Sequence, residues 1–299
     1  MLSKKNRSNG LFEPAAPGFT YIKSQRNIGY KPQTALGDLA DNSIDADAKN
    51  IWVDVESKDS VINRIFIADD GFGMNGETLF GSFKLGYERK RTQNQLGKFG
   101  VGGTIGSLSL AALKITITRD LEGINARKYD LAEIQKQDQW GSISLKIEPW
   151  MIEKLDSYVG EGETGTLIIL SNLDKLSSKR KGNFERTIIN YFSQIYCQQI
   201  AAEEIQIKVC GKTVPSKDPI FFFHKDVNVL VDELIPETEM RIRVVNLKNI
   251  VTGDSVAKQG GYIFRCNRLI EKKIVNNDSW DSVWNYHPNY RSVRWAVYY

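Results

Sequence analysis

The chain has 299 residues, of which 41% are hydrophobic and 25% charged, as in ordinary globular proteins. Its net charge of +4 permits contact with nucleic acid without indicating it. No apolar run approaches the roughly 18 residues of a transmembrane helix, so we expect no membrane partner. The basic N-terminus lacks an apolar stretch behind it, so we expect no secretory signal. Three cysteines and two histidines argue against disulfides, a zinc site and histidine catalysis. A cytoplasmic protein is expected, or a nuclear or nucleoid protein if it contacts DNA.

The first informative stretch is 35–46, which follows a segment, 1–20, that we expect to be a flexible leader. The stretch 35–46 has the period of a helix, and its apolar residues form one stripe: Leu36, Leu39, Ala40 and Ile44. A second face carries polar residues spaced i, i+4 and i+7: Asp38, Asn42 and Asp45. Because no lysines accompany these carboxylates, the row indicates a site that holds a metal ion and orients a water. The alternative is a solvated acidic face.

The second stretch, 69–74, is Asp-Asp-Gly-Phe-Gly-Met and ends a predicted buried strand at 64–68. A half-buried strand at 51–56 precedes it, and a helix at 76–85 is predicted to follow. Glycines at alternate positions let the backbone bend sharply and approach a ligand. A carboxylate at the end of a strand is well placed to accept a hydrogen bond from an exocyclic amine.

The third stretch, 97–103, is rich in glycine and leads into a helix-like apolar segment at 105–113. A polar, basic segment at 86–95 precedes it and is expected to be a mobile loop. A glycine-rich loop at a helix N-terminus offers free N–H groups and the positive end of the helix dipole to a phosphate. The alternative is a flexible turn without a ligand.

A charged linker near 177–182 places a domain boundary in the chain, which gives domains at 21–178 and 179–299. The first domain continues with four predicted strands: 114–118, 125–131, 142–147 and 165–170. The second opens with a helix at 184–199 and continues with four strands: 204–209, 227–231, 240–247 and 261–265. The last residues, 295–299, have the pattern of a strand interior, so we expect the chain to be the N-terminal part of a longer protein.

Two further patterns do not support a nucleotide-binding fold of another kind. The sequence from Gly71 to Gly76 matches the dinucleotide pattern G-x-G-x-x-G, but the region about 20 residues later is basic, where that fold needs an acid. The run 211–213, Gly-Lys-Thr, resembles the end of a P-loop, but the required first glycine is Gln206.

The stretches together resemble the GHKL ATPase superfamily, which includes gyrase B, heat-shock-ninety chaperones, histidine kinases, MutL and the Microrchidia (MORC) proteins. Residues 38–46 are similar to the N-box, E-L-x-x-N-x-x-D-A, and 69–74 to the D-x-G-x-G-M motif. Residues 97–102 are similar to the G-x-x-G-x-G lid motif, and Gly165-Thr166 to the threonine strand. Residues 261–270 resemble the Y-x-x-N-R-L-I strand of MORC-type proteins. The order and compact spacing are closest to MORC and MutL.

The resemblance implies a fold and a set of roles. The fold is an α/β (α+β) two-layer sandwich, a Bergerat-type ATP-binding domain with a mixed sheet, followed by a smaller α/β transducer-like (S5-like) domain. Asp38 would be the general base, Asn42 would bind Mg²⁺, and Asp69 would accept a hydrogen bond from adenine. The remaining residues implied to bind ATP lie in the same motifs: Asp45, Ala46, Gly71, Gly73, Met74, Gly97, Lys98, Phe99, Gly100, Val101, Gly102, Gly103 and Thr166.

Two departures from the family bear on activity. Asp38 stands where the family has glutamate, and a side chain shorter by one methylene shifts the base by about 1 Å, which can cost on the order of 10²-fold in rate. The lysine that many relatives send to the γ-phosphate has two candidates here, Lys272 and Lys273, and solvent exposure is the alternative for both.

The function expected from the sequence is a slow, Mg²⁺-dependent ATPase that acts as a conformational switch, with lid closure on ATP driving formation of a homodimer. One alternative is a non-hydrolysing, nucleotide-gated module that binds a protein partner, which the aspartate at position 38 favours. Another is a DNA-handling protein in repair, chromatin-like compaction or defence.

Overall fold

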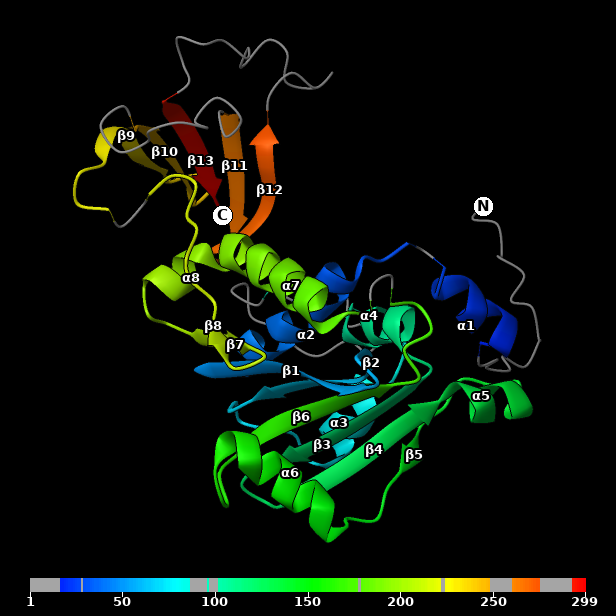
Figure 1. The fold of residues 1–299 in the computed structure, drawn as a ribbon. Coiled ribbons are helices and arrows are strands. Elements are labelled where there is room, and N and C mark those ends of the chain that lie inside the picture. The colour runs from blue at the N-terminus through cyan, green and yellow to red at the C-terminus, as the bar shows by residue number, and fades with distance from the viewer. Residues whose placement is uncertain are drawn as a thin grey trace, which may run out of the picture.

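The structure is a computed structural model and describes residues 17–27, 29–86, 96, 102–176, 179–221, 224–247, 260–274 and 292–299. Two sheets dominate it, with helices between them (Figure 1). No helix within these ranges is long and apolar enough to span a membrane.

The first sheet has eight strands in the order β5-β4-β3-β6-β2-β1-β7-β8. Within it β1 and β7 run parallel, and the other described neighbours run antiparallel. This confirms the predicted mixed sheet, and most of its neighbouring strands are antiparallel. The strands are β1 Asn50–Lys58, β2 Val61–Asp69, β3 Leu113–Arg119, β4 Ile124–Asp130, β5 Ile143–Ser144, β6 Gly165–Ser171, β7 Gln206–Val209 and β8 Lys212–Thr213.

Three helices cover one face of the first sheet: α2 (Pro32–Asp45), α4 (Gly102–Leu110) and α7 (Lys181–Ile195) (Figure 1). Pro32 occupies the first turn of α2, where a missing N–H costs nothing. The apolar stripe of α2 is buried as predicted at Leu36, Leu39 and Ala40, whereas Ile44 is half-buried. Helix α7 adds buried side chains at helical spacing to the same core: Phe184, Ile188, Phe192 and Ile195.

Helix α6 (Pro149–Val159) packs on the opposite face of the first sheet, where the sequence did not predict a helix. Its Met151 and Leu155 join a second core with Phe66 and Ile169. The predicted strand at 142–147 is correspondingly short, since only Ile143 and Ser144 form β5. The partly buried Leu145 and Ile147 instead pack against the core beside α6. The smaller helices around this sheet are α1 Phe19–Gln25, α3 Gly76–Ser82 and α5 Leu131–Gln137.

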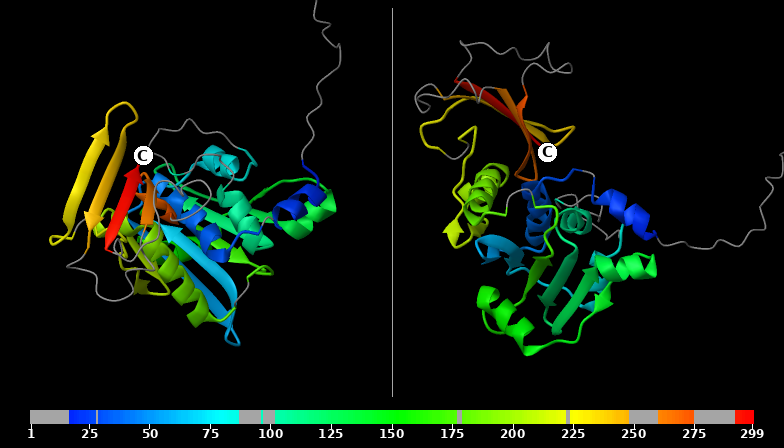
Figure 2. Two further views of the ribbon diagram at one scale, coloured as in Figure 1. Left: turned by 90° about the horizontal axis from the view of Figure 1, so that it is seen from above. Right: turned by 45° about the vertical axis from the view of Figure 1, so that its right-hand side comes forward.

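The second sheet has five strands in the order β12-β11-β13-β10-β9. Helices α7 and α8 (Cys197–Ala201) lie between it and the first sheet (Figures 1 and 2). The predicted helix at 184–199 is thus two helices, which meet at Tyr196. The strand pattern predicted at 295–299 is confirmed for residues 295–298, which belong to β13. The strands are β9 Asn228–Ile235, β10 Met240–Asn246, β11 Gly260–Arg265, β12 Arg268–Ile274 and β13 Val293–Tyr298.

The segment after residue 179 contributes to both sheets. Strands β7 and β8 extend the first sheet through the parallel pairing of β7 with β1, while β9 to β13 form the second. The expected division into domains at 21–178 and 179–299 stays a prediction. Helix α7 begins just after the expected boundary, and its apolar face belongs to the core of the first sheet.

Candidate active site

The polar side chains predicted for one face of helix α2 lie at two different depths. Asp38 and Asp45 are half-buried and Asn42 is exposed, while the neighbouring Leu39 is buried in the core. The packing of the apolar stripe therefore fixes the direction in which the polar row projects.

Asp69 is the buried acid of the site. It ends β2, and only 6% of its surface is exposed. The Ser43 hydroxyl donates to Asp69 Oδ2 at 2.8 Å, and the Gly71 N–H donates to Oδ1 at 3.1 Å. Burial raises the pKa of Asp69 to about 6, although these two hydrogen bonds lower it. At neutral pH the group is a carboxylate with a fixed orientation, which suits it to accept a hydrogen bond from a ligand amine.

The loop after Asp69 is pressed against its surroundings at both glycines. A Cβ on Gly71 would lie 2.7 Å from the Ala46 carbonyl oxygen. Gly73 has a φ of +69°, and a Cβ there would lie 1.9 Å from the Arg119 carbonyl oxygen. The Phe72 N–H donates to the Ala46 oxygen at 3.0 Å, so the loop is attached to the end of α2.

Two threonines on the neighbouring strands β6 and β3 follow Asp69 across the sheet. Thr166 is the register partner of Asp69 across β2 and β6, and of Thr118 across β3 and β6. The Thr118 and Thr166 hydroxyls are 3.0 Å apart, and the Met74 N–H donates to Thr118 Oγ1 at 2.9 Å. The structure thus brings the predicted Thr166 and Met74 to the predicted Asp69. Thr118, which connects them, had no signal in the sequence.

Asp38 is paired with Tyr30, which lies just before α2. The Tyr30 hydroxyl is hydrogen-bonded to Asp38, and burial together with this carboxylate raises the pKa of Tyr30 to about 12. Tyr30 therefore stays protonated as a donor. Burial raises the pKa of Asp38, while the Tyr30 hydrogen bond and the charge of Arg268 lower it. A half-buried carboxylate of this kind can accept a proton from water.

Asn42 and the N-terminal end of α4 lie close together. A Cβ on Gly103 would be 2.5 Å from Asn42 Nδ2, so a larger residue there would displace the Asn42 side chain. Gly102 and Gly103 begin α4, so their backbone lies at a helix N-terminus, where N–H groups can bind an anion. The other predicted phosphate-binding residues lie outside the described residues: Gly97, Lys98, Phe99, Gly100 and Val101.

These residues fit Mg²⁺ bound together with a nucleotide. Mg²⁺ keeps several waters and takes one or two protein oxygens plus substrate phosphates. Asn42 is exposed, and its side-chain amide lies beside Gly103 of α4. In the described part of the chain, no three Asp, Glu, His or Cys side chains gather as a metal site. The donor set therefore suits an ion that bridges phosphates rather than one caged by protein.

Asp45, a later residue of the N-box, binds a backbone N–H group. Asp45 Oδ1 accepts a hydrogen bond of 2.7 Å from the N–H of Leu96, the residue before the glycine-rich stretch. Of the two candidate switch lysines, Lys272 donates to Gln194 Oε1 on α7 at 3.0 Å, and the side chain of Lys273 lies outside the described residues.

Sequence reasoning missed several polar residues of the site: Tyr30, Asp41, Ser43, Thr118, Tyr196 and Arg268. Asp41 carried a usable signal, since it lies three residues after Asp38 and faces the same side of the helix. Ser43 and Thr118 carried none, because a serine in a helix and a threonine in a strand are ordinary there.

Comparison with known proteins supports the class that the fold and site define. Residues 30–166 match the protein family described as "Histidine kinase-, DNA gyrase B-, and HSP90-like ATPase". The matched region begins at Tyr30, next to Asp38, and ends at Thr166, next to Asp69. This match confirms that the region resembles the GHKL ATPase superfamily, a superfamily of ATPases.

Within that class the chain is similar to microrchidia proteins. It is 35% identical to "Protein MICRORCHIDIA 5" of Arabidopsis thaliana over 143 residues, 42% of this chain and 20% of the relative. It is 28% identical to "ATPase morc-1" of Caenorhabditis elegans over 120 residues, 38% of this chain and 14% of the relative. The matches span a fifth of these relatives or less.

Proposed function

We propose that this chain is a Mg²⁺-dependent ATPase that works as a conformational switch. The observation that carries the proposal is the buried carboxylate of Asp69, held by Ser43 and Gly71 at the edge of a glycine loop. A carboxylate with this fixed orientation would accept a hydrogen bond from the adenine amino group. Gly71 and Gly73, whose lack of a side chain lets the loop pack against Ala46 and Arg119, would let the loop backbone pass close to the base. Met74 would pack against the face of the base.

The adenine assignment is tested by Asp69→Asn. Because hydrogen bonds to charged groups contribute about 1.5–3 kcal/mol, ATP binding is expected to weaken by about 10- to 100-fold. Asp70→Asn is the matched control, since the Asp70 carboxylate accepts from the N–H groups of Lys49 and Asn50 instead. Equal ATP affinity in Asp69→Asn and wild type would show the assignment to be wrong.

Phosphate binding is assigned to the end of α2 and the start of α4. Asn42 would hold Mg²⁺, which neutralises phosphate charge when bound. Gly102 and Gly103, with Gly100 and Val101 before them, would offer backbone N–H groups to the phosphates. Lys98 would add a point charge. Asp45 and Ala46 would act indirectly, through Leu96 and Phe72.

Hydrolysis is assigned to Asp38 as general base. A water oxygen bonds to the γ-phosphorus while the bond to the β,γ-bridging oxygen breaks, and ADP leaves with that electron pair. Asp38 takes the water proton. Because aspartate is one methylene shorter than the glutamate of the family, slow turnover is expected.

The switch itself would be ATP-dependent dimerisation. Closure of the lid segment, 86–103, over the nucleotide would complete a surface for a second copy, and hydrolysis would reset it. The test is Mg²⁺-dependent ATP turnover across a range of protein concentrations, with Asp38→Ala alongside. Turnover per chain that rises with concentration and vanishes in Asp38→Ala supports the proposal. Equal turnover in both chains would contradict the role of Asp38.

The second candidate is a non-hydrolysing, nucleotide-gated module that binds a protein partner. The shorter Asp38 favours it, and so does the Tyr30 hydrogen bond that already engages this carboxylate. ATP binding without turnover at any protein concentration would decide for this candidate. Contact with DNA stays a further proposal that rests on the net charge of +4, and a steep loss of DNA binding with added salt would support it.

A further inference from the structure

The turn between β11 and β12 places two arginines side by side. Cys266 and Asn267 form this turn, with φ angles of 47° and 61°. A two-residue turn with both φ angles positive is the tight type that matches the twist of a hairpin. It makes Arg265 and Arg268 direct cross-strand partners, so their side chains leave the same face of the hairpin.

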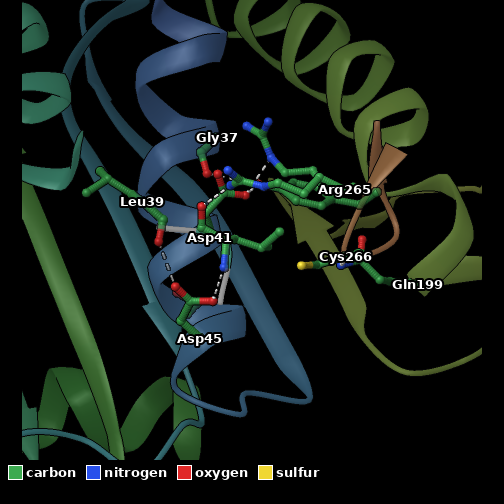
Figure 3. Close-up of polar contacts among 11 residues, drawn as sticks. Gly37, Leu39, Asp41, Asp45, Gln199, Arg265 and Cys266 are labelled. Atoms are coloured by element: carbon green, nitrogen blue, oxygen red, sulfur yellow. Dashed lines mark hydrogen bonds and ion pairs between the residues drawn. The ribbon is translucent and has the colours of Figure 1, made fainter. Parts of the chain in front are cut away.

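Arg268 reaches α2 and pairs with Asp41. Its Nε lies 2.7 Å from Asp41 Oδ1, and only 13% and 12% of the two side chains are exposed. The Tyr196 hydroxyl lies 2.8 Å from both Asp41 Oδ1 and the Gly37 carbonyl oxygen. This cluster joins the second sheet, the end of α7 and the middle of α2. Figure 3 shows Arg265 of the hairpin on the side of α2 that carries Gly37 and Asp41.

The Arg268 guanidinium lies close to the backbone of α2 at Gly37. A Cβ at Gly37 would lie 3.5 Å from Arg268 Nη2 and 3.3 Å from Tyr191 Cε1. The guanidinium therefore lies beside the turn of α2 that carries Asp38. Asp41 follows Asp38 by three residues and precedes Asn42 by one, so a force on Asp41 moves both groups.

Arg265 makes a second contact with the same site. It donates a hydrogen bond to the Leu96 carbonyl oxygen, and the Leu96 N–H donates to Asp45 at the end of α2. Leu96 is thus held between the hairpin and α2, and it is buried. Gln199 of α8 donates to the Cys266 carbonyl oxygen at 3.4 Å, which connects the turn to the helix beneath it. Arg265, Cys266 and Asp45 are labelled in Figure 3.

We propose that Arg268, supported by Arg265, is a positioning residue that couples the second sheet to catalysis by fixing the turn of α2 that carries Asp38. This inference rests on the proposed ATPase function, because Arg268 would affect the rate of hydrolysis by positioning Asp38, the proposed general base. Arg268 does not need to touch the nucleotide. It holds Asp41, and the helix transmits that constraint to Asp38 and Asn42.

The test separates turnover from binding in Arg268→Met. We expect kcat to fall at least about tenfold, as misplacement of a catalytic group does, while the Kd for ATP changes by less than about threefold. Arg268→Lys keeps the charge and should recover part of kcat. Arg241→Met is the matched control, because Arg241 pairs with Asp232 within the second sheet, at 2.6 Å. Unchanged kcat in Arg268→Met, or equal losses of kcat and ATP affinity, would overturn the proposal.

Two further measurements keep the test decisive. If Arg268→Met does not fold, Asp41→Asn takes its place, since it removes the charge of the pair at constant shape, and the same split is expected. If the wild-type chain binds ATP without turnover, the proposed hydrolysis fails on its own. Hydrogen exchange of residues 37–45 in the nucleotide-free chain then decides the coupling. Faster exchange in Arg268→Met but not in Arg241→Met supports it, and unchanged exchange overturns it.

Discussion

The Ser43 hydroxyl on α2 donates a hydrogen bond of 2.8 Å to Asp69 Oδ2 at the end of β2. This contact connects the helix that carries the proposed base to the carboxylate assigned to adenine. Since Ser43 immediately follows Asn42, one turn of α2 takes part in both halves of the proposed nucleotide site.

Ser43→Ala is expected to weaken ATP binding by about 3- to 10-fold, because a hydrogen bond to a carboxylate is lost while the oxygen stays buried. Titration calorimetry with ATP measures the change. Ser193→Ala is the control, since Ser193 is also buried in a helix but bonds to the Asn190 carbonyl oxygen of α7. A similar loss of affinity in both variants would indicate a general effect of removing a buried serine.

Adenosine binding is expected to depend on pH through Asp69. Its pKa is raised to about 6, so the carboxyl group becomes protonated below that value and loses its capacity as a double acceptor. Affinity should fall by up to about tenfold for each pH unit below 6. Adenosine is the suitable probe because it carries no phosphate that titrates in this range. Binding that stays constant from pH 7 to pH 5 would contradict the assignment.

The same group affects the free energy of unfolding. A carboxyl whose pKa is higher in the folded state binds its proton more tightly there than in the unfolded chain. Its contribution therefore falls as pH rises from about 4 to about 6, by up to about 3 kcal/mol. We expect the free energy of unfolding of wild type to fall by this amount, relative to that of Asp69→Asn, across this pH range. Urea unfolding of both proteins at pH 4.5 and 7 gives the difference, and parallel pH profiles would refute it.

Gly71→Ala is expected to abolish detectable ATP binding and to lower stability. The new methyl group would lie 2.7 Å from the Ala46 oxygen and 2.8 Å from Ala46 Cβ, so the loop must separate from α2. Gly182→Ala is the control, because no atom lies within 4 Å of its added Cβ and its helix α7 should gain about 0.5–1 kcal/mol. Thermal unfolding and ATP titration of both variants provide the comparison.

Tyr30→Phe is expected to shift the acid limb of the kcat profile to higher pH. The Tyr30 hydrogen bond lowers the pKa of Asp38, so its removal raises that pKa further above the usual range of an aspartate. Turnover should therefore fall more at pH 6 than at pH 8. An equal fall at every pH would mean that Tyr30 acts on the site only through packing.

Asp38→Glu restores the side-chain length of the family at this position. We expect kcat to rise, by up to about 10²-fold if reach limits the rate, with little change in ATP affinity. Single-turnover measurements distinguish faster chemistry from faster product release. A lower kcat in Asp38→Glu would show that α2 is already placed to suit the shorter residue.

The local parts of the site were predictable because their signals are local. The helical period of residues 35–46 predicted both faces of α2, and the alternate glycines at 71 and 73 predicted the sharp loop. The helix α6 was missed, and the predicted strand at 142–147 proved to be two residues long. There the apolar residues Leu145 and Ile147 pack against a core beside α6, so tertiary packing replaced strand pairing.

By itself the sequence identified the region that resembles the GHKL ATPases, since the spacing of Asp38, Asn42 and Asp69 is a property of the chain. Only the tertiary structure decided what holds these groups in place. Arg268 and Asp41 are 227 residues apart, and Thr118 and Thr166 are 48 apart. Such pairs meet only after the strand order of two sheets is set. The local sequence pattern around a polar residue does not indicate which distant residue it contacts. Burial then makes each contact necessary, since an unpaired polar group within the core would cost free energy.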